Sequence, residues 1–79
     1  MKDHGIAFED AKYVFCDYGR IETYDEREDY GEDRWATIGF VGSVLVYVVY
    51  TVRDEDDIRL ISARKANAKE IEQYHEANP

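Results

Sequence analysis

The segment Arg59-Leu-Ile-Ser-Ala-Arg-Lys65 carries the side chains best suited to chemistry in this chain. Its two arginines bracket the end of a predicted β-strand, and a guanidinium held on a rigid strand can bind phosphate through two parallel hydrogen bonds. Lys65 and Lys69 follow with no acidic residue between them. Cleavage of an RNA phosphodiester needs an aligned 2′-hydroxyl, neutralisation of the developing charge and movement of a proton. The spacing alone is a weak signal for that chemistry.

Other candidate residues are scattered along the chain. Arg34 opens another predicted strand, where contact with RNA and a structural pair with a loop acid are both open. For Trp35 beside it, stacking on a nucleobase is one interpretation, although a position in the core is the favoured one. Cys16 is expected to be a buried structural thiol. Because His4 and His75 lie at opposite ends of the chain and no Gly-rich phosphate loop is present, we expect no metal and no cofactor.

Charge is distributed unevenly along the chain. Ten basic and eighteen acidic residues give a net charge of −8, which argues against nucleic-acid binding by the molecule as a whole. Residues 59–79 nevertheless hold four basic and three acidic side chains, whereas acids concentrate at 25–33 and 54–57. A local basic strip can therefore exist on an acidic protein, although ordinary surface cations would leave the same pattern.

The length of 79 residues predicts one domain over 1–79, since a chain this short buries only about 60% of the surface that its unfolded form exposes. No apolar run is long enough to span a bilayer as a helix. One Cys and no recognisable signal peptide indicate a reducing compartment. We therefore expect a cytoplasmic protein that does not associate with membranes.

The elements that must position these side chains follow from periodicity. Apolar residues at helical spacing predict a short helix that ends before Gly19. The continuous β-branched and aromatic run at 44–53 predicts a central strand covered on both faces. Strict alternation over 58–63 would place Arg59 on the same side as Ile61 and Ala63.

The two ends of the chain are predicted to be helical. Asn67 and Glu70 have the spacing of a capping box, which starts a helix that carries Ala68, Ile71, Tyr74 and His75 along one side. The resulting order is helix, strand, strand, strand, strand, helix. This order predicts an α+β fold in which helices pack on an antiparallel sheet of about four strands.

Several segments, in order along the chain, resemble the BrnT family of toxins. The motifs are His4-Gly-Ile-Ala-Phe-Glu-Asp-Ala11 with Val14-Phe15, Glu32-Asp-Arg-Trp35 with Ile38-Gly39, Val46 to Thr51, and Ile58-Arg-Leu-Ile-Ser-Ala-Arg-Lys-Ala66 with Glu70 and Tyr74. The last of them is the most specific. They cover nearly the whole chain with compatible spacing.

This resemblance implies a RelE-like fold and a type II toxin that cleaves cellular RNA. It also implies a cognate antitoxin of the BrnA type, which carries a ribbon-helix-helix DNA-binding domain and neutralises the toxin. DNA would then be contacted only indirectly, through the antitoxin. Family members usually begin with an additional strand and a longer helix that leads into Lys-His-Gly. Since this chain starts at Met1-Lys-Asp-His4, we expect an exposed sheet edge that invites pairing with a second copy.

Together, these observations predict a metal-independent endoribonuclease toxin. We expect Arg59 and Arg64 to hold phosphate and His4 to move the proton, a task that suits histidine because its side chain changes charge near neutral pH. A residue on the surface without such a role is the alternative interpretation of His4. The residues expected to contact RNA are Arg34, Lys65 and Lys69. The alternative is a non-catalytic or diverged BrnT-like module that pairs with an antitoxin or with itself. A plain structural domain is the third reading.

Overall fold

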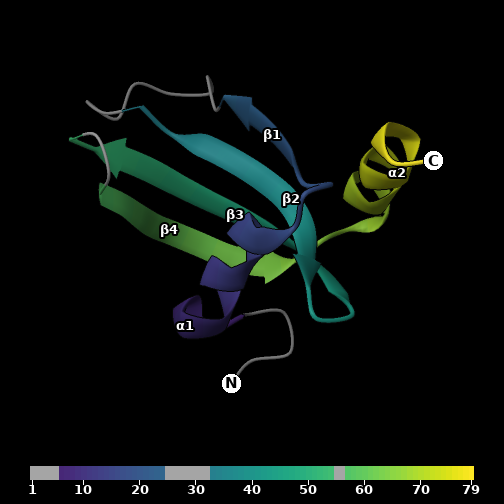
Figure 1. Cartoon of the computed structure of the whole chain (residues 1–79), viewed down its shortest axis with the longest axis horizontal. Helices are drawn as coiled ribbons and strands as arrows, with labels where there is room; N and C mark the ends of the chain where they lie inside the picture. Colours follow the sequence, from purple (N-terminus) through teal and green to yellow (C-terminus); the bar gives the residue numbers. More distant parts are fainter. Residues whose placement is uncertain (1–5, 25–32, 55–56) are drawn as a thin grey trace.

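The structure is a computed structural model, and it describes residues 6–24, 33–54 and 57–79. Two helices and a four-stranded antiparallel sheet make up the fold, as expected for the α+β class (Figure 1). The elements are α1 (Phe8–Ala11), the 3₁₀ helix η1 (Lys12–Cys16), β1 (Ile21–Tyr24), β2 (Trp35–Val41), β3 (Val44–Arg53), β4 (Asp57–Lys65) and α2 (Ala68–Ala77). In the described part of the chain, no helix has the length and apolar character needed to cross a membrane.

The first helical segment changes type after one turn. Ala7 provides no side-chain cap, and α1 passes directly into η1. A 3₁₀ helix has three residues per turn, so Ala11 and Val14 both face the sheet and are fully buried. This geometry turns Cys16 outward. The expectation of a buried thiol is therefore wrong, because Cys16 lies two residues after the buried Val14 and so points away from the sheet.

The four strands form an open sheet in sequence order, with each strand antiparallel to the next. β2 and β3 are joined through a tight turn at Gly42, where φ is 62°, a conformation that glycine adopts without steric cost. β3 lies inside the sheet and is buried along most of its length. The continuous hydrophobic run thus predicts the central strand correctly.

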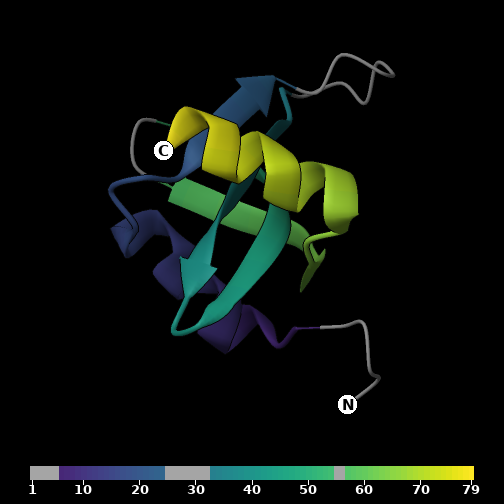
Figure 2. The same cartoon turned by 90° about the vertical axis from the view of Figure 1, so that its right-hand side faces the viewer.

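The helices cover the two faces of the sheet unequally. α1 and η1 lie along one face, whereas α2 lies across one end of the sheet (Figures 1 and 2). The core against the first helical segment contains Ala11, Val14, Val46 and Val48. A second core under α2 contains Ile38, Leu45 and Tyr74. We call these two sides the α1 face and the α2 face.

A β-bulge interrupts the pairing of β3 with β4. Val49 pairs with Ser62, but the next residue, Tyr50, pairs with Leu60, so Ile61 is an extra residue on β4. The bulge reverses the alternation on one side of it. Arg59 and Arg64 therefore share the α2 face, and the expectation that Arg59 would share a side with Ala63 is wrong.

The C-terminal helix begins at the predicted capping box. The Asn67 side chain accepts from the Glu70 amide at 2.8 Å, and the Glu70 carboxylate accepts from the Asn67 amide at 2.9 Å. Of the predicted apolar stripe, only Tyr74 is buried, while Ile71 and His75 are exposed. Only part of that side of the helix packs on the sheet, because α2 crosses one end of the sheet instead of lying along it.

The far end of α2 is fastened to the first helical segment. Asp17, just after η1, accepts from the Tyr74 hydroxyl and from the Phe40 amide, each at 2.8 Å. Burial acts to raise the pKa of Asp17, but these hydrogen bonds, that of the Gly19 amide and the charge of Arg20 outweigh it and lower the pKa. α2 is thus held in place at both of its ends.

Candidate nucleic-acid interface on the α2 face

The α2 face is organised in rows of side chains that run across the strands. Residues directly opposite each other on neighbouring strands point to the same side of a sheet. The rows, read outward from α2, are Ile21–Ile38–Tyr47–Arg64, then Thr23–Ala36–Val49–Ser62, then Thr51–Arg59, then Arg53–Asp57. The face therefore changes from mainly apolar under α2 to a mixture of apolar and hydroxyl side chains in the middle and to charged side chains at the far end.

Arg59 stands in the third row, on an exposed part of the sheet. Its guanidinium donates from Nε to Asp57 Oδ2 at 3.1 Å, and Nη2 lies 3.1 Å from the same oxygen. Hydrogen bonding to Asp57 raises the pKa of Arg59 further, so the guanidinium stays charged. Both side chains are well exposed, and solvent screens such a pair. A phosphate can therefore compete for Arg59 at low cost.

Arg64 stands two rows closer to α2 and is held more firmly. It donates from Nη1 and Nη2 to the two carboxylate oxygens of Glu70, each at 2.8 Å, and its guanidinium lies 4.3 Å from the centre of the Tyr47 ring. Burial acts to raise the pKa of Glu70, but the hydrogen bonds from Arg64 and from the Asn67 amide outweigh it and lower the pKa. Glu70 thus fixes both the start of α2 and the position of Arg64.

Both arginines are paired with carboxylates, but in different geometries. Arg64 pairs with two oxygens, an arrangement that phosphate also accepts, whereas Arg59 contacts a single oxygen of Asp57 through two nitrogens. Arg59 and Arg64 lie on the same face with about 13 Å of strand between their rows, by the rise per residue of an antiparallel strand. This separation suits contacts with different parts of a nucleic-acid chain.

The remaining predicted residues divide between the two faces. Arg34 immediately precedes β2 and by alternation shares the α2 face with Ala36, whereas Trp35 lies on the α1 face, where its ring packs against Tyr24 at 5.0 Å. Lys69 lies on the first turn of α2. Lys65 pairs with Val46 and so lies on the α1 face, away from Arg59 and Arg64.

The proposed proton-transfer residue, His4, lies outside the described residues. The structure therefore does not place it relative to the arginines. The other histidine, His75, is exposed on α2, where its ring packs edge-on against Tyr74 at 5.7 Å.

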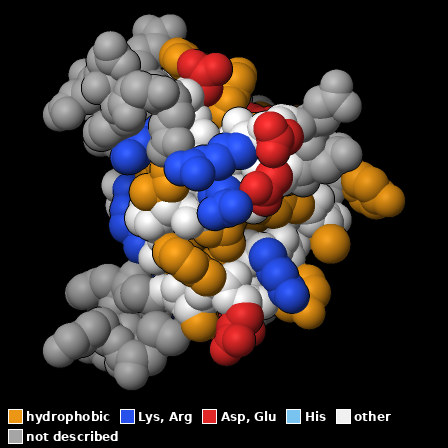
Figure 3. Space-filling view, turned by 90° about the vertical axis from the view of Figure 1, so that its left-hand side faces the viewer, with side chains coloured by type: hydrophobic (Ala, Val, Ile, Leu, Met, Phe, Trp, Pro, Cys, Tyr) orange, Lys and Arg blue, Asp and Glu red, His pale blue; other side chains and the backbone are white. Residues whose placement is uncertain are grey.

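The charged end of the sheet shows the same combination of signs at the surface. Where β3 ends and β4 begins, Lys and Arg side chains gather together with Asp and Glu side chains beside them (Figure 3). The Arg59–Asp57 pair belongs to this region. The local positive charge is therefore real but is balanced by adjacent carboxylates.

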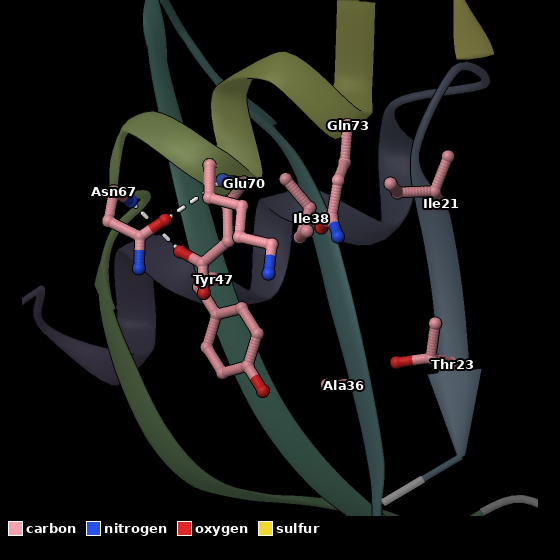
Figure 4. A pocket seen from close by; sticks show the side chains of 9 residues that line it. Ile21, Thr23, Ala36, Ile38, Tyr47, Asn67, Glu70 and Gln73 are labelled. Atoms are coloured by element: carbon pink, nitrogen blue, oxygen red, sulfur yellow. Dashed lines mark hydrogen bonds between the residues drawn. The ribbon is translucent and has the colours of Figure 1, made fainter. Parts of the chain in front are cut away.

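A pocket of about 510 Å³ opens between the start of α2 and the first two rows of the α2 face. Figure 4 shows Tyr47 and Thr23 on opposite sides of it, with Ala36 between them and Gln73 reaching down from α2. The remaining lining residues are Ile21, Ile38, Asn67, Lys69 and Glu70. The pocket shares Tyr47 and Glu70 with the site of Arg64.

Comparison with known proteins identifies the family. The model of the ribonuclease toxin BrnT, of type II toxin–antitoxin systems, matches residues 1–70. The chain belongs to the BrnT family. The match covers the sheet and the start of α2, and hence both candidate arginines. A search of curated proteins finds no match.

Reasoning from sequence missed several residues of this candidate site. Tyr47 lies in a run that is apolar on both faces, so the alternation that singles out a surface aromatic is hidden. Glu70 carries a signal as a capping residue, but its contact with Arg64 depends on how α2 folds back toward β4. Gln73 has no signal in the sequence at all.

Among the described residues, no three His, Cys, Asp or Glu side chains gather in a way that could hold a metal ion. Besides the carboxylates of Asp57 and Glu70, which lie beside the two arginines, the α2 face offers guanidinium, ammonium, hydroxyl and carboxamide groups. These groups bind and orient phosphates, and guanidinium groups also neutralise charge that develops on a phosphate oxygen.

Proposed function

We propose that this protein is an endoribonuclease toxin that binds RNA along the α2 face and needs no metal. The observation that carries the proposal is the β-bulge at Ile61, which brings Arg59 and Arg64 to one face in a chain of the BrnT family. In this role, both guanidinium groups bind phosphate oxygens of the RNA, and Arg64 neutralises the charge that forms when the 2′-hydroxyl attacks. Arg34 and Lys69 extend the contact, and His4 moves the proton.

The carboxylates next to the arginines set the resting state of this site. The Arg59–Asp57 pair is exposed, so a phosphate readily replaces Asp57 as the partner of Arg59. Glu70 is only 12% exposed and keeps Arg64 oriented. Arg59 would then act mainly in capturing the RNA. Arg64, which is already positioned by Glu70 and Tyr47, would act at the scissile phosphate.

The test is cleavage of an end-labelled RNA by the purified chain in the presence of a chelator. Arg64→Gln should lower the cleavage rate by about 100-fold, as the loss of one charge-stabilising donor does in other enzymes. Lys12→Gln removes the same charge from η1, on the other side of the sheet, and should leave the rate unchanged. A folded wild-type chain that neither cleaves RNA nor slows growth when expressed contradicts the proposal.

We further propose a cognate antitoxin of the BrnA type as the partner that neutralises the toxin in the cytoplasm. Membership in a type II toxin–antitoxin family supports an antitoxin partner. A short gene next to this one that encodes a ribbon-helix-helix protein, and copurification of the two products, would test the pairing. DNA contact would then require the antitoxin.

A second candidate function is a non-catalytic module that holds an antitoxin or a second copy of itself. It is favoured by the pairing of Arg59 and Arg64 with carboxylates, which leaves both guanidinium groups neutralised at rest. The exposed outer edges of the described sheet, β1 and β4, offer backbone groups for pairing. Tight antitoxin binding, or a stable dimer in sedimentation, without RNA cleavage would favour this function.

A further inference from the structure

We propose that the pocket between α2 and the sheet is a nucleobase subsite, which gives the proposed ribonuclease a preference for the base beside the phosphate held by Arg64. This inference rests on the proposed function, because it assigns one nucleotide of the RNA to a definite place. The occupant is one base of a single-stranded RNA.

The pocket exists because a small residue stands between larger ones. Ala36 lies in the row Thr23–Ala36–Val49, and its methyl group leaves an empty space that Tyr47 and Thr23 flank (Figure 4). Ile21 and Ile38 add apolar surface at the end nearest α2. The pocket therefore has an apolar floor at Ala36 between the larger side chains of Tyr47 and Thr23. This shape and polarity suit a flat heterocycle better than a charged group.

The rim of the pocket carries groups that can read the edge of a base. Gln73 directs its carboxamide toward the pocket from α2, and among residues 6–24, 33–54 and 57–79 no side chain or backbone group bonds to that amide. A carboxamide offers both a donor and an acceptor. Thr23 adds a hydroxyl on the opposite wall. Such a set discriminates among bases by hydrogen bonding, as a phosphate-binding cation cannot.

The neighbouring charges match the rest of a nucleotide. Arg64 stacks on Tyr47, one wall of the pocket, and Lys69 lines its rim. Within the described residues, no carboxylate pairs with Lys69, so its ammonium group is available for a phosphate oxygen. A base in the pocket would place its own phosphate next to these two cations. The combination of an aromatic wall and nearby cations is typical of single-stranded nucleic-acid binding.

An acidic side chain of an antitoxin is the competing occupant. The Glu70 carboxylate forms part of the lining, and it would repel a second carboxylate placed in the pocket. Burial of an acid on the apolar floor of Ile38 and Ala36 would add a desolvation cost. A neutral base avoids both costs, so the observations favour RNA.

The experiment measures binding of the four nucleoside 3′-monophosphates and of ribose 5-phosphate by calorimetry, which needs no cleavage. We expect at least one nucleotide to bind about tenfold tighter than ribose 5-phosphate, which corresponds to about 1.4 kcal/mol. Gln73→Ala should remove the difference among the four bases. Glu76→Ala, an exposed change on the same helix, should leave it intact. Equal binding of nucleotides and ribose 5-phosphate overturns the proposal.

A second variant tests the space itself. Ala36→Leu fills the pocket and should weaken the binding of every nucleotide. Binding of ribose 5-phosphate should be kept, which also shows that the variant is folded. Loss of antitoxin binding in Ala36→Leu and Gln73→Ala, with nucleotide binding unchanged, would assign the pocket to the antitoxin and overturn the inference.

The outcomes separate this inference from the proposed function. If nucleotides bind with a base preference but the chain does not cleave RNA, the nucleobase subsite is supported and the proposed ribonuclease activity is contradicted. If the chain cleaves RNA with no base preference at the cut site, and Gln73→Ala changes nothing, the ribonuclease activity is supported and the nucleobase subsite is contradicted.

Discussion

The two faces of the sheet are built from the same strands but serve different ends. On the α1 face, Val14, Val46 and Val48 are essentially inaccessible to solvent, and Phe15 packs edge-on against Tyr50 at 5.0 Å. On the α2 face, a core cluster with Ile38 and Leu45 lies under α2, and the pocket and the charged rows lie beyond it. One face therefore holds the fold together, and the other has room for a ligand.

This difference predicts unequal tolerance to added volume. A Cβ at Gly39, on the α1 face of β2, would lie 2.9 Å from both Val14 Cγ2 and Arg20 Cβ. Gly39→Ala should therefore destabilise the protein by about 2 kcal/mol in chemical denaturation, since overpacking forces neighbours to shift. Ala36→Val, on the other face of the same strand, adds more atoms but fills the pocket. It should change the unfolding free energy by less than about 0.5 kcal/mol.

An equal cost for both substitutions would mean that the pocket closes in solution. The two faces would then be packed alike, and the space for a base would be lost. A larger cost for Ala36→Val than for Gly39→Ala would reverse the assignment of the faces.

The sequence anticipates elements whose cause is local. The apolar run of β3 and the capping box at Asn67 and Glu70 are confirmed because each depends on residues close together in the chain. The bulge at Ile61 could not be foreseen, since it is a property of how β4 pairs with β3. The candidate site depends on that bulge, so alternation alone would have placed Arg59 and Arg64 on opposite faces.

The partners of the arginines were equally beyond the sequence. Glu70 meets Arg64 only because the chain turns at Ala66 and Asn67 and brings α2 back toward β4. The helix carrying Cys16 shows the same limit on a smaller scale. Phe15, the neighbour of Cys16, packs against the sheet, but Cys16 itself is exposed, so proximity in sequence to an apolar residue did not predict burial.

Glu70 allows the structural and functional roles of the α2 face to be separated. Glu70→Gln retains a carbonyl oxygen that can accept from the Asn67 amide, but it loses the charged pair with Arg64. We expect a loss of about 1 kcal/mol of stability, a modest value because Arg64 is 42% exposed. Glu70→Ala also breaks the capping box and should cost about 1 kcal/mol more.

Glu70→Gln should also lower both kcat and KM for RNA cleavage, for two different reasons. A freed Arg64 binds phosphate more readily, so KM for RNA should fall, while kcat falls because the guanidinium is no longer oriented. A fall in kcat with KM unchanged would indicate a purely structural role for Glu70.

The stability of both ends of α2 should depend on pH. Asp17 and Glu70 have pKa values below their ordinary values of 3.8 and 4.5 in the folded protein. The unfolded chain therefore binds more protons as the pH falls through this range, and the stabilisation present at neutral pH is lost in acid. Unfolding free energies measured between neutral pH and about pH 3 should fall, and Asp17→Asn should make that fall shallower.

The alkaline side should show the opposite dependence. Burial, and then the hydrogen bond to Asp17 and its charge, raise the pKa of Tyr74 above its ordinary value of 10.0. The stabilisation from its neutral hydroxyl is present below that value and is lost as the pH rises through the folded-state pKa. Tyr74→Phe should remove this alkaline dependence. If neither Asp17→Asn nor Tyr74→Phe changes the dependence of stability on pH, the hydrogen bond between Tyr74 and Asp17 does not form in solution.

The smallest effect, and the sharpest test of the two faces, comes from two lysines four residues apart. Lys69 lines the pocket on the α2 side, whereas Lys65 pairs with Val46 on the α1 face. Lys69→Gln and Lys65→Gln lower the net charge equally, so any difference between them reports position and not overall charge. For single-stranded RNA, each lost phosphate contact should reduce the slope of log affinity against log salt by about 0.7. We expect this reduction for Lys69→Gln alone, measured by salt titration of RNA binding. The same reduction for Lys65→Gln would mean that the RNA crosses the edge of β4, and the functional distinction between the faces would fail.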